Sequence, residues 1–370
     1  MGSQRATIVD FGDIPDWVDD DHDAALAAFV RHRLKPANEI YNRAPKGCDP
    51  EALMQLVHDA TAVAPGFSRD FFEQNFVPVR LARENGDGAN ERPIVTAFFE
   101  PEYQASRIRS DKFNIPIYAR PKNLVARKDA PSGAVPDDFR FAWRNQDGSY
   151  GMAPDRAAID QGALTDKAEV LAWLEDPIDS FFMHVQGAAR LDLTDGTQMR
   201  VSYAAKTGHP FTAIGGVLVK RGAIPLESVS MQSISAWLRA NPDESEALMH
   251  ENRSYIFFKE TPLGEAPLGP IAAAKIQLTA QRSLAVDMRY HTFATPIFVQ
   301  ADKVNDAPFA KLMIAQETGT AIKGPSRGDL FVGTGREAGE AAGGVLSPAT
   351  FFVLCPKTGY QTYLEKWLGT

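Results

Sequence analysis

Cysteine is scarce in this chain of 370 residues, which holds only Cys48 and Cys355. Cys355 ends the apolar run FFVLC, so we expect a thiol buried in the core. Cys48 lies in the segment KGCDP, which we expect to be a loop. A disulfide between the two is compatible with the sequence, but no spacing supports it, and two cysteines do not decide the redox compartment.

Long apolar runs are also missing. No stretch reaches the roughly 18 consecutive apolar residues that a membrane-spanning helix needs. The N-terminus, MGSQRATIVDFGD, has no hydrophobic signal core. The protein is therefore expected either in the cytoplasm or with its export segment removed. The opening Met-Gly-Ser resembles the start of an expressed fragment and favours removal.

Positive charge is in the minority, with 39 Lys and Arg against 47 Asp and Glu and a formal net charge of -8. This balance argues against nucleic acid as a partner, because phosphate binding needs a basic surface. A local exception runs from Arg107 to Lys128 and includes seven basic residues. It could face an anionic polymer, or it could be an ordinary solvated face of mixed charge.

Motifs for metals and cofactors are absent too. The seven histidines include no H-x-x-x-H or H-E-x-x-H spacing, so we predict no metal and no cofactor. Gly324 to Gly328 matches G-x-S-x-G, but a strand-like run follows the serine where a nucleophile elbow needs a helix. Gly333 to Gly339 has the spacing GxGxxxG, which is not that of a dinucleotide loop.

What the chain has in abundance is turn residues, with 28 Gly and 25 Pro spread along its length. This distribution predicts a mainly β protein with peripheral helices. Helices are expected at 23–34, 49–63, from Ser68, at 165–175 and in two segments over 230–250. Short strands, close enough to form a closed or half-closed barrel, are expected at 94–99, 116–120, 181–186, 273–278, 283–287, 296–300, 309–316, 329–332 and 351–354, with a hairpin over 189–201 that turns at Asp195-Gly196.

One acidic residue stands out in the segment from Ala315 to Gly343. Asp329 follows Gly328 directly and precedes Gly333 by four residues, so we expect it on a tight turn at the end of a short strand. Such positions suit a carboxyl group that must be held rigidly. The alternative is an ordinary turn aspartate that accepts backbone hydrogen bonds.

Five segments follow one another in the order of a known set of motifs. The best preserved are P-I-Y-A-R-P from Pro116 and the helix signature S-M-Q-x-I-x-x-W-L from Ser230. The other three carry substitutions, and they are Ala97–Pro101, Gln186–Arg190 and Ser202–Phe211. Together the five segments resemble the lytic murein transglycosylase A family. Ala97, Ala189 and Ala205 stand where the family has glycine, and Phe98 and Phe99 where it has tyrosine.

The C-terminal part resembles a domain named for three aspartates, the 3D domain. The first aspartate matches Asp287, the second position holds Glu317, and the third matches Asp329, which is the catalytic acid/base in the family. The resemblance implies supporting roles for Glu317, Asp287 and Lys323, in which Glu317 stabilises a neighbouring donor such as Lys323. Lys323 could instead be a solvated lysine. The resemblance also implies that glycan is bound by Phe99, Glu100, Tyr118, Gln186, Lys206 and His209, although His209 could instead lock the turn before Pro210. His184 would share a strand face with Gln186, or would be a satisfied histidine of a half-buried strand.

The implied activity is non-hydrolytic cleavage of the β-1,4 bond between N-acetylmuramic acid and N-acetylglucosamine in peptidoglycan. The C6 hydroxyl of the muramic acid closes on C1 to give a 1,6-anhydro end, and one carboxyl group serves as acid and then as base. We expect a raised pKa for Asp329. Two alternatives stay open: an inverting hydrolase that uses Asp329 with Glu317, and a glycan-binding protein without activity.

The resemblance further implies two β domains. A double-psi β-barrel would be formed by residues 1–122 and 262–370, with a second β domain inserted at 123–261 and glycan held in the groove between them. Peptidoglycan glycan strands are the expected partner of a monomer, and other cell-wall partners stay unknown. The expected place is the periplasm, with an outer-membrane anchor in the full-length protein that this chain does not carry.

Overall fold

The computed structural model describes residues 4–35, 40–83, 93–304 and 307–368. The chain divides into two compact units. The first comprises Met1–Phe99, Glu265–Gly333 and Val345–Thr370, and the second comprises Glu100–Gly264 and Thr334–Gly344. The sequence places its boundaries near residues 122 and 261. The second unit begins earlier than that, because β4 (Glu102–Ser106) and β5 (Ile115–Tyr118) belong to its main sheet.

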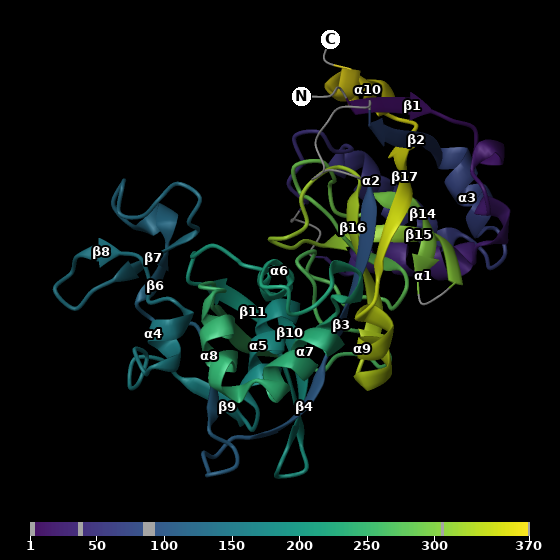
Figure 1. Cartoon of the computed structure of the whole chain (residues 1–370). Coiled ribbons are helices and arrows are strands. Elements are labelled where there is room, and N and C mark those ends of the chain that lie inside the picture. The colour runs from purple at the N-terminus through teal and green to yellow at the C-terminus, as the bar shows by residue number, and fades with distance from the viewer. Residues whose placement is uncertain (1–3, 36–39, 84–92, 305–306, 369–370) are drawn as a thin grey trace. The chain divides into compact units, whose positions relative to one another are not determined.

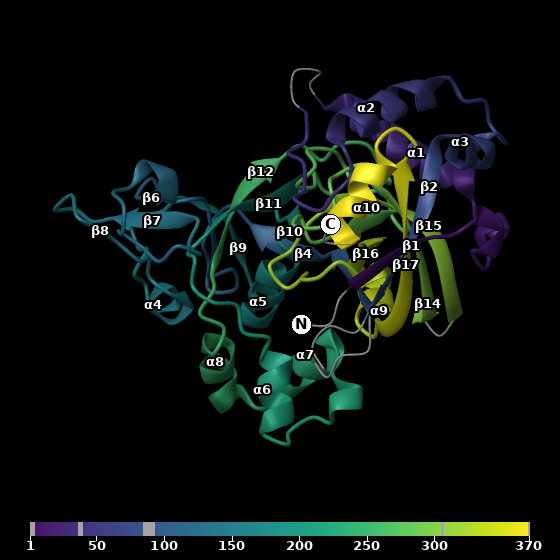
Figure 2. The same cartoon turned by 90° about the horizontal axis from the view of Figure 1, so that it is seen from above.

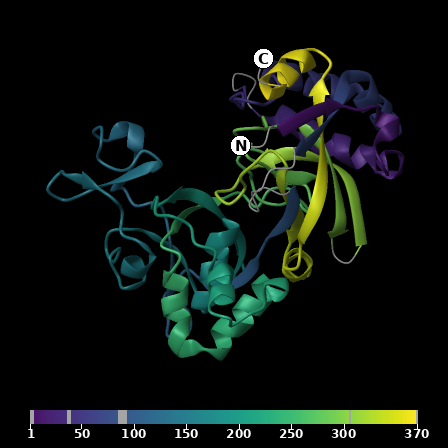
Figure 3. The same ribbon diagram turned by 45° about the horizontal axis from the view of Figure 1, so that its top comes forward.

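The first unit is a closed six-stranded barrel with an extension (Figure 1). Around the ring, each strand pairs with the next and the last returns to the first. In order these strands are β17 (Leu346–Pro356), β14 (Pro296–Val304), β15 (Ala307–Glu317), β13 (Ser283–Ala285), β16 (Arg327–Thr334) and β3 (Ile94–Glu100). β2 (Phe76–Arg83) and β1 (Gln4–Ile8) extend the sheet from β17. Figure 3 shows the long β17 running beside β14, with which it pairs.

Helices cover the outside of this barrel. They are α1 (His22–Val30), α2 (Pro50–Asp59), α3 (Ser68–Asn75) and α10 (Tyr360–Leu368), of which α10 lies next to β1. Phe29 of α1, Phe71 and Phe72 of α3 and Phe76 of β2 pack with ring centroids 5.5–6.3 Å apart. The predicted start of the second helix is confirmed, because Asp49 accepts from the N–H groups of Glu51 and Ala52 and Pro50 is the first helical residue.

The second unit is built on a six-stranded sheet of order β12 (Ile256–Thr261), β11 (Gln198–Lys206), β10 (Ala188–Leu193), β4, β9 (Val170–Leu174) and β5. A bridge between Ala119 and Phe258 links the ends of this order. β10 and β11 form the predicted hairpin, with Gly196 at φ 83° in its turn. A small sheet is added by β6 (Leu124–Ala126), β7 (Phe141–Arg144) and β8 (Tyr150–Gly151).

The remaining helices belong to the second unit. They are α4 (Arg156–Asp160), α5 (Pro177–Gln186), α6 (Ile214–Lys220), α7 (Met231–Ala240), α8 (Pro242–His250) and α9 (Arg336–Ala342). α6, α7 and α8 gather with α5 around one apolar cluster (Figure 2). The predicted cap at Ser230 is confirmed, and it forms a reciprocal capping box with Ser233. Across the described ranges, no helix is long and apolar enough to span a bilayer.

Three predicted elements are wrong. Residues 181–186 form the end of α5 instead of a strand, because Asp176 caps a helix that starts at Pro177 and Gly187 ends it at φ 80°. Residues 170–174 form β9 instead of a helix, and Ala172 and Leu174 alternate as its buried face. Residues 273–278 form a turn with a single bridge from Ile271 to Gln277.

A fully buried ion pair lies at the start of the second unit. Arg200 Nε is 2.7 Å from Glu100 Oε1, and both side chains have an exposed fraction of 0%. Arg200 Nη2 donates to Glu100 Oε2 at 3.0 Å, and Thr334 Oγ1 donates to the same oxygen at 2.9 Å. Glu100 therefore joins β11 to the returning segment that begins at Thr334.

Substituting Glu100→Gln should lower the free energy of unfolding by about 3–5 kcal/mol, because Arg200 would keep its charge in the core without a carboxylate. Urea-induced unfolding measures this change. Glu102→Gln is the matched control, since Glu102 pairs with Arg190 at 3.2 Å on the surface, and its loss should stay below about 1 kcal/mol. Equal effects of the two substitutions would contradict the structural role of Glu100.

Candidate active site

Asp329 lies inside β16. The sequence predicts it on a tight turn at the end of a strand, and this placement is wrong. Asp329 stands opposite Ala285 of β13, and its neighbour Leu330 stands opposite Leu284. Leu330 points into the barrel core, so Asp329 and Phe331 lie on the other face of the strand. The Asp329 side chain is half-buried there, on a strand whose two neighbours fix its position.

The neighbouring strand β3 supplies the partners of this face. Thr96 Oγ1 donates a hydrogen bond to Asp329 Oδ1. Two residues further along both strands, the rings of Phe98 and Phe331 meet with centroids 5.3 Å apart. The contacts therefore advance in the same direction along β3 and β16, and they fix which residue of β3 meets Asp329.

Arg327 completes the surroundings of the carboxyl group. Its Nη2 donates to Thr96 Oγ1 at 2.7 Å, so one hydroxyl connects the guanidinium to Asp329. Burial raises the pKa of Asp329, while the charge of Arg327 and the Thr96 hydrogen bond oppose this rise without cancelling it. The site thus favours the neutral acid and still offers a positive charge and a donor to the carboxylate.

Glu317, the last residue of β15, stands on the other side of β13. It pairs with Ala285, the same residue that faces Asp329. Two strand spacings put the Cα atoms of Asp329 and Glu317 roughly 10 Å apart. Glu317 Oε2 accepts from Ala273 N at 3.0 Å and Oε1 accepts from Thr318 N at 2.7 Å. Burial raises the pKa of Glu317 to about 7, although these hydrogen bonds and the charge of Lys275 oppose the rise.

Asp287 has a different environment two residues beyond β13. Its Oδ2 accepts from Gly324 N at 2.8 Å, and its carboxylate pairs with Arg289. Burial pushes the pKa of Asp287 upward, but the bonds from Arg289 and Gly324 outweigh it and leave the pKa lowered. His291 Nε2 also donates to Pro325 O at 2.7 Å, so the segment that leads into β16 is held at two points.

The expected contact between Lys323 and Glu317 is not present in the structure. Lys323 is exposed, and the oxygens of Glu317 are taken up by the backbone of Ala273 and Thr318. Thr96 and Arg327 were missed by the sequence reasoning. Arg327 precedes Asp329 by two residues, which on a strand means the same face, and this was an available signal. Nothing in the sequence indicates Thr96, because its contact depends on the pairing of β3 with β16.

The glycan-binding residues predicted from the sequence differ in exposure. Phe99 in the first unit and Glu100, Tyr118 and His209 in the second are buried. His209 Nε2 donates to Ala153 O at 2.7 Å. Gln186 at the end of α5 and Lys206 at the end of β11 are half-buried. His184 lies in α5, and its Nδ1 is 3.1 Å from Nη1 of the buried Arg156. Glycan contact by these residues stays a prediction.

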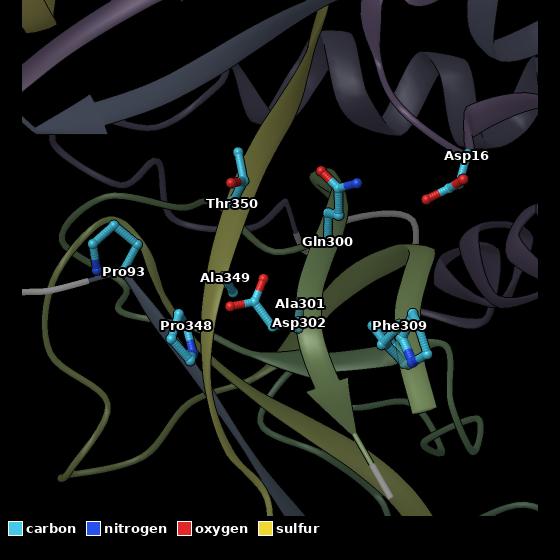
Figure 4. Close-up of a pocket in the computed structure, with 10 residues that line it drawn as sticks. Asp16, Pro93, Gln300, Ala301, Asp302, Phe309, Pro348, Ala349 and Thr350 are labelled. Carbon is cyan, nitrogen blue, oxygen red and sulfur yellow. The ribbon is translucent and has the colours of Figure 1, made fainter. Parts of the chain in front are cut away.

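A hollow of about 680 Å³ lies elsewhere on the first unit (Figure 4). Gln300 and Asp302 of β14, Phe309 of β15 and Thr350 of β17 contribute to its lining, together with Asp16. Neither Asp329 nor Thr96 is among its lining residues, so it is separate from the carboxyl site.

The barrel with its half-buried carboxyl group and the second β unit correspond to two known domain types. Residues 94–259 match the MltA-specific insert domain, and residues 282–355 match the 3D domain. The chain belongs to the membrane-bound lytic murein transglycosylase A (MltA) family, as the motif resemblance predicted.

Individual relatives support this membership. A membrane-bound lytic murein transglycosylase from Agrobacterium tumefaciens has a crystal structure 40% identical in sequence, with a TM-score of 0.87 over 97% of this chain and 99% of that one. Membrane-bound lytic murein transglycosylase A of Escherichia coli K12 is 33% identical over 256 residues, and the match spans 67% of this chain but only 61% of the relative. A structure of E. coli MltA with bound chitohexaose has a TM-score of 0.69 at 25% identity, over 95% of this chain and 94% of that one.

Substituting Thr96→Val should raise the pKa of Asp329 further, because the carboxylate loses a hydrogen bond that favours its charged form. Carbon-13 NMR titration of the carboxyl groups measures the shift, with Asp329→Asn used to assign the signal. Thr350→Val, the same change in β17, is the control. An unchanged or lowered pKa in Thr96→Val would refute the tuning role.

Substituting Glu317→Gln should flatten the pH dependence of stability between pH 4.5 and about 7. In this window the native wild type keeps a proton that the unfolded chain has released, so its free energy of unfolding falls as pH rises. The variant should gain at most about 3 kcal/mol relative to wild type by pH 8. Urea unfolding at a series of pH values measures this, with exposed Glu340→Gln as control. A parallel pH dependence in wild type and Glu317→Gln would contradict the raised pKa.

Proposed function

We propose that this protein is a lytic transglycosylase that cleaves the β-1,4 bond between N-acetylmuramic acid and N-acetylglucosamine in peptidoglycan. The observation that carries the proposal is the environment of Asp329, a half-buried carboxyl group of raised pKa with a guanidinium-backed hydroxyl beside it. Family membership supports the same activity, since relatives 26–40% identical are named lytic murein transglycosylases or homologues of them.

The proposed cycle uses one carboxyl group twice. Neutral Asp329 donates its proton to the glycosidic oxygen, and the bond from C1 to that oxygen breaks. The resulting carboxylate then accepts the proton of the C6 hydroxyl as O6 bonds to C1, which closes the 1,6-anhydro ring and restores the acid. No water is consumed. Arg327 and Thr96 stabilise the carboxylate that exists between the two transfers.

We further propose that Gln186 and Lys206 contact the glycan, since both are half-buried. For Phe99, Glu100, Tyr118 and His209 glycan contact stays a prediction that their burial does not favour. Chitohexaose bound to E. coli MltA supports a cleft for several N-acetylhexosamine units. The connectivity of the barrel is proposed to be double-psi, a finer topology than its six closed strands establish. We propose that the protein acts in the periplasm, where it would meet peptidoglycan, and that it is a monomer. Membrane attachment is proposed from the relatives that are named membrane-bound.

An inverting hydrolase is the second candidate. The shared register of Asp329 and Glu317 on β13 favours it, because a separation of roughly 10 Å between Cα atoms is compatible with the wide carboxylate spacing of inverting enzymes. In that case Glu317 would activate a water on the far side of the sugar ring. Its two backbone hydrogen bonds favour a supporting role instead.

Digestion of purified peptidoglycan tests the proposal. Wild type should give anhydro ends, one water lighter than reducing ends by mass spectrometry, and Asp329→Asn should lose about 100-fold or more of this activity because the acid and base are both removed. Glu317→Gln, judged folded by its circular dichroism, should still give anhydro ends. Reducing ends that depend on Glu317 would favour the hydrolase, and a wild type that binds glycan without products would favour a binding protein.

A further inference from the structure

The only two cysteines of the sequence meet in the core of the first unit. Cys48 and Cys355 are separated by 307 positions, yet their Sγ atoms lie 3.5 Å apart. Their exposed fractions are 3% and 0%, and both belong to the main apolar cluster. They are free thiols in this structure. The sequence left the pairing of these residues open, because nothing in their spacing brings them together.

The backbone on each side of this contact is fixed by other interactions. Cys355 lies within β17 and pairs with Val77 of β2. On the other side, Thr292 Oγ1 donates to Cys48 O at 2.8 Å. A Cβ on Gly47 would come within 2.4 Å of the same Thr292 oxygen, so this loop packs directly against its neighbour.

The C-terminal helix α10 holds the same loop from a further direction. Lys366 Nζ donates to Gly47 O at 3.1 Å, and Trp367 Nε1 donates to Lys46 O at 3.3 Å. These contacts hold the backbone around Cys48 in place next to Cys355. The fold presents the two sulfurs to each other, and they need to approach by only about 1.5 Å to reach the bond length of a disulfide, roughly 2.05 Å.

We propose that Cys48 and Cys355 form an intramolecular disulfide when the chain folds in the presence of a disulfide donor. The two thiols lose two protons and two electrons, the sulfur–sulfur bond forms, and the donor disulfide is reduced to two thiols. The reaction needs no other reactant. This proposal does not depend on the proposed glycan chemistry.

Burial determines when the bond can form. Disulfide exchange needs a thiolate that a donor can reach. Burial, together with the neighbouring Cys48, raises the pKa of the Cys355 thiol well above its usual range, and neither sulfur is open to solvent. The bond should therefore form before the core closes, and the folded protein should keep whichever redox state it acquired.

The bond would also have a structural consequence. It would tie the loop before α2 to β17, the strand that pairs with β2, β14 and β3. A crosslink between positions so far apart in sequence restricts the unfolded chain strongly. The oxidised protein should therefore melt higher than the reduced one, by roughly 5 °C or more.

Refolding under two redox conditions tests the proposal. Reduced, urea-unfolded full chain is refolded with glutathione disulfide or with dithiothreitol, then alkylated in urea and digested with trypsin without reduction. We expect the disulfide donor to yield a linked pair of peptides, Gly47–Arg69 with Glu337–Lys357, in monomeric protein. The linked protein should be two hydrogens lighter and should melt higher than the reduced form.

Cys48→Ala is the control variant, and its melting temperature should be the same under both conditions. If the wild type refolded with the donor keeps both thiols alkylatable, or forms only intermolecular links or glutathione adducts, the proposal is overturned. An equal rise in melting temperature for Cys48→Ala would likewise overturn the stabilising role. Folded reduced wild type should resist oxidation for hours, and rapid oxidation would contradict the protection of the thiols by burial.

Discussion

The environment of the Asp329 carboxyl group depends on one strand pairing, that of β3 with β16. Thr96 and Asp329 are 233 positions apart in sequence, and they meet only because these two strands are neighbours in the barrel. The ring is closed by β17, which pairs with both β14 and β3. Without closure, β3 would be an open edge and the hydroxyl beside Asp329 would not be fixed. Barrel geometry is thus a precondition of the proposed chemistry.

Three carboxyl groups on or next to β13 illustrate how environment sets acidity. Asp287 faces Arg289 and a backbone N–H, and its pKa is lowered. Glu317 is half-buried and accepts from the backbone N–H groups of Ala273 and Thr318, and burial raises its pKa to about 7. Burial also raises the pKa of Asp329, while the charge of Arg327 and the hydrogen bond from Thr96 oppose the rise. A group that must first give and then take a proton needs such a compromise, since a strongly stabilised carboxylate would be a poor acid.

Sequence reasoning reached the family, the six barrel strands in outline and the prominence of Asp329 through ordered motifs. The prediction of elements failed where a short segment is compatible with both a strand and a helix. Residues 181–186 are predicted as a strand with His184 and Gln186 on one face, although Asp176-Pro177 before them and Gly187 after them mark the ends of a helix. Sequence reasoning also could not identify Thr96, because a cross-strand partner is determined by tertiary pairing.

Glu100 shows that a motif match identifies a residue without revealing its role. The chain passes from one unit to the other at 99/100, 264/265, 333/334 and 344/345. Glu100, Leu263 and Thr334, which stand at or near three of these passages, all lie around the guanidinium of Arg200. Arg200 pairs with Glu100, donates to Leu263 O, and shares the Glu100 carboxylate with Thr334. Because β3 ends at Glu100 and β16 ends at Thr334, the same pair holds the ends of the two strands that carry Thr96 and Asp329.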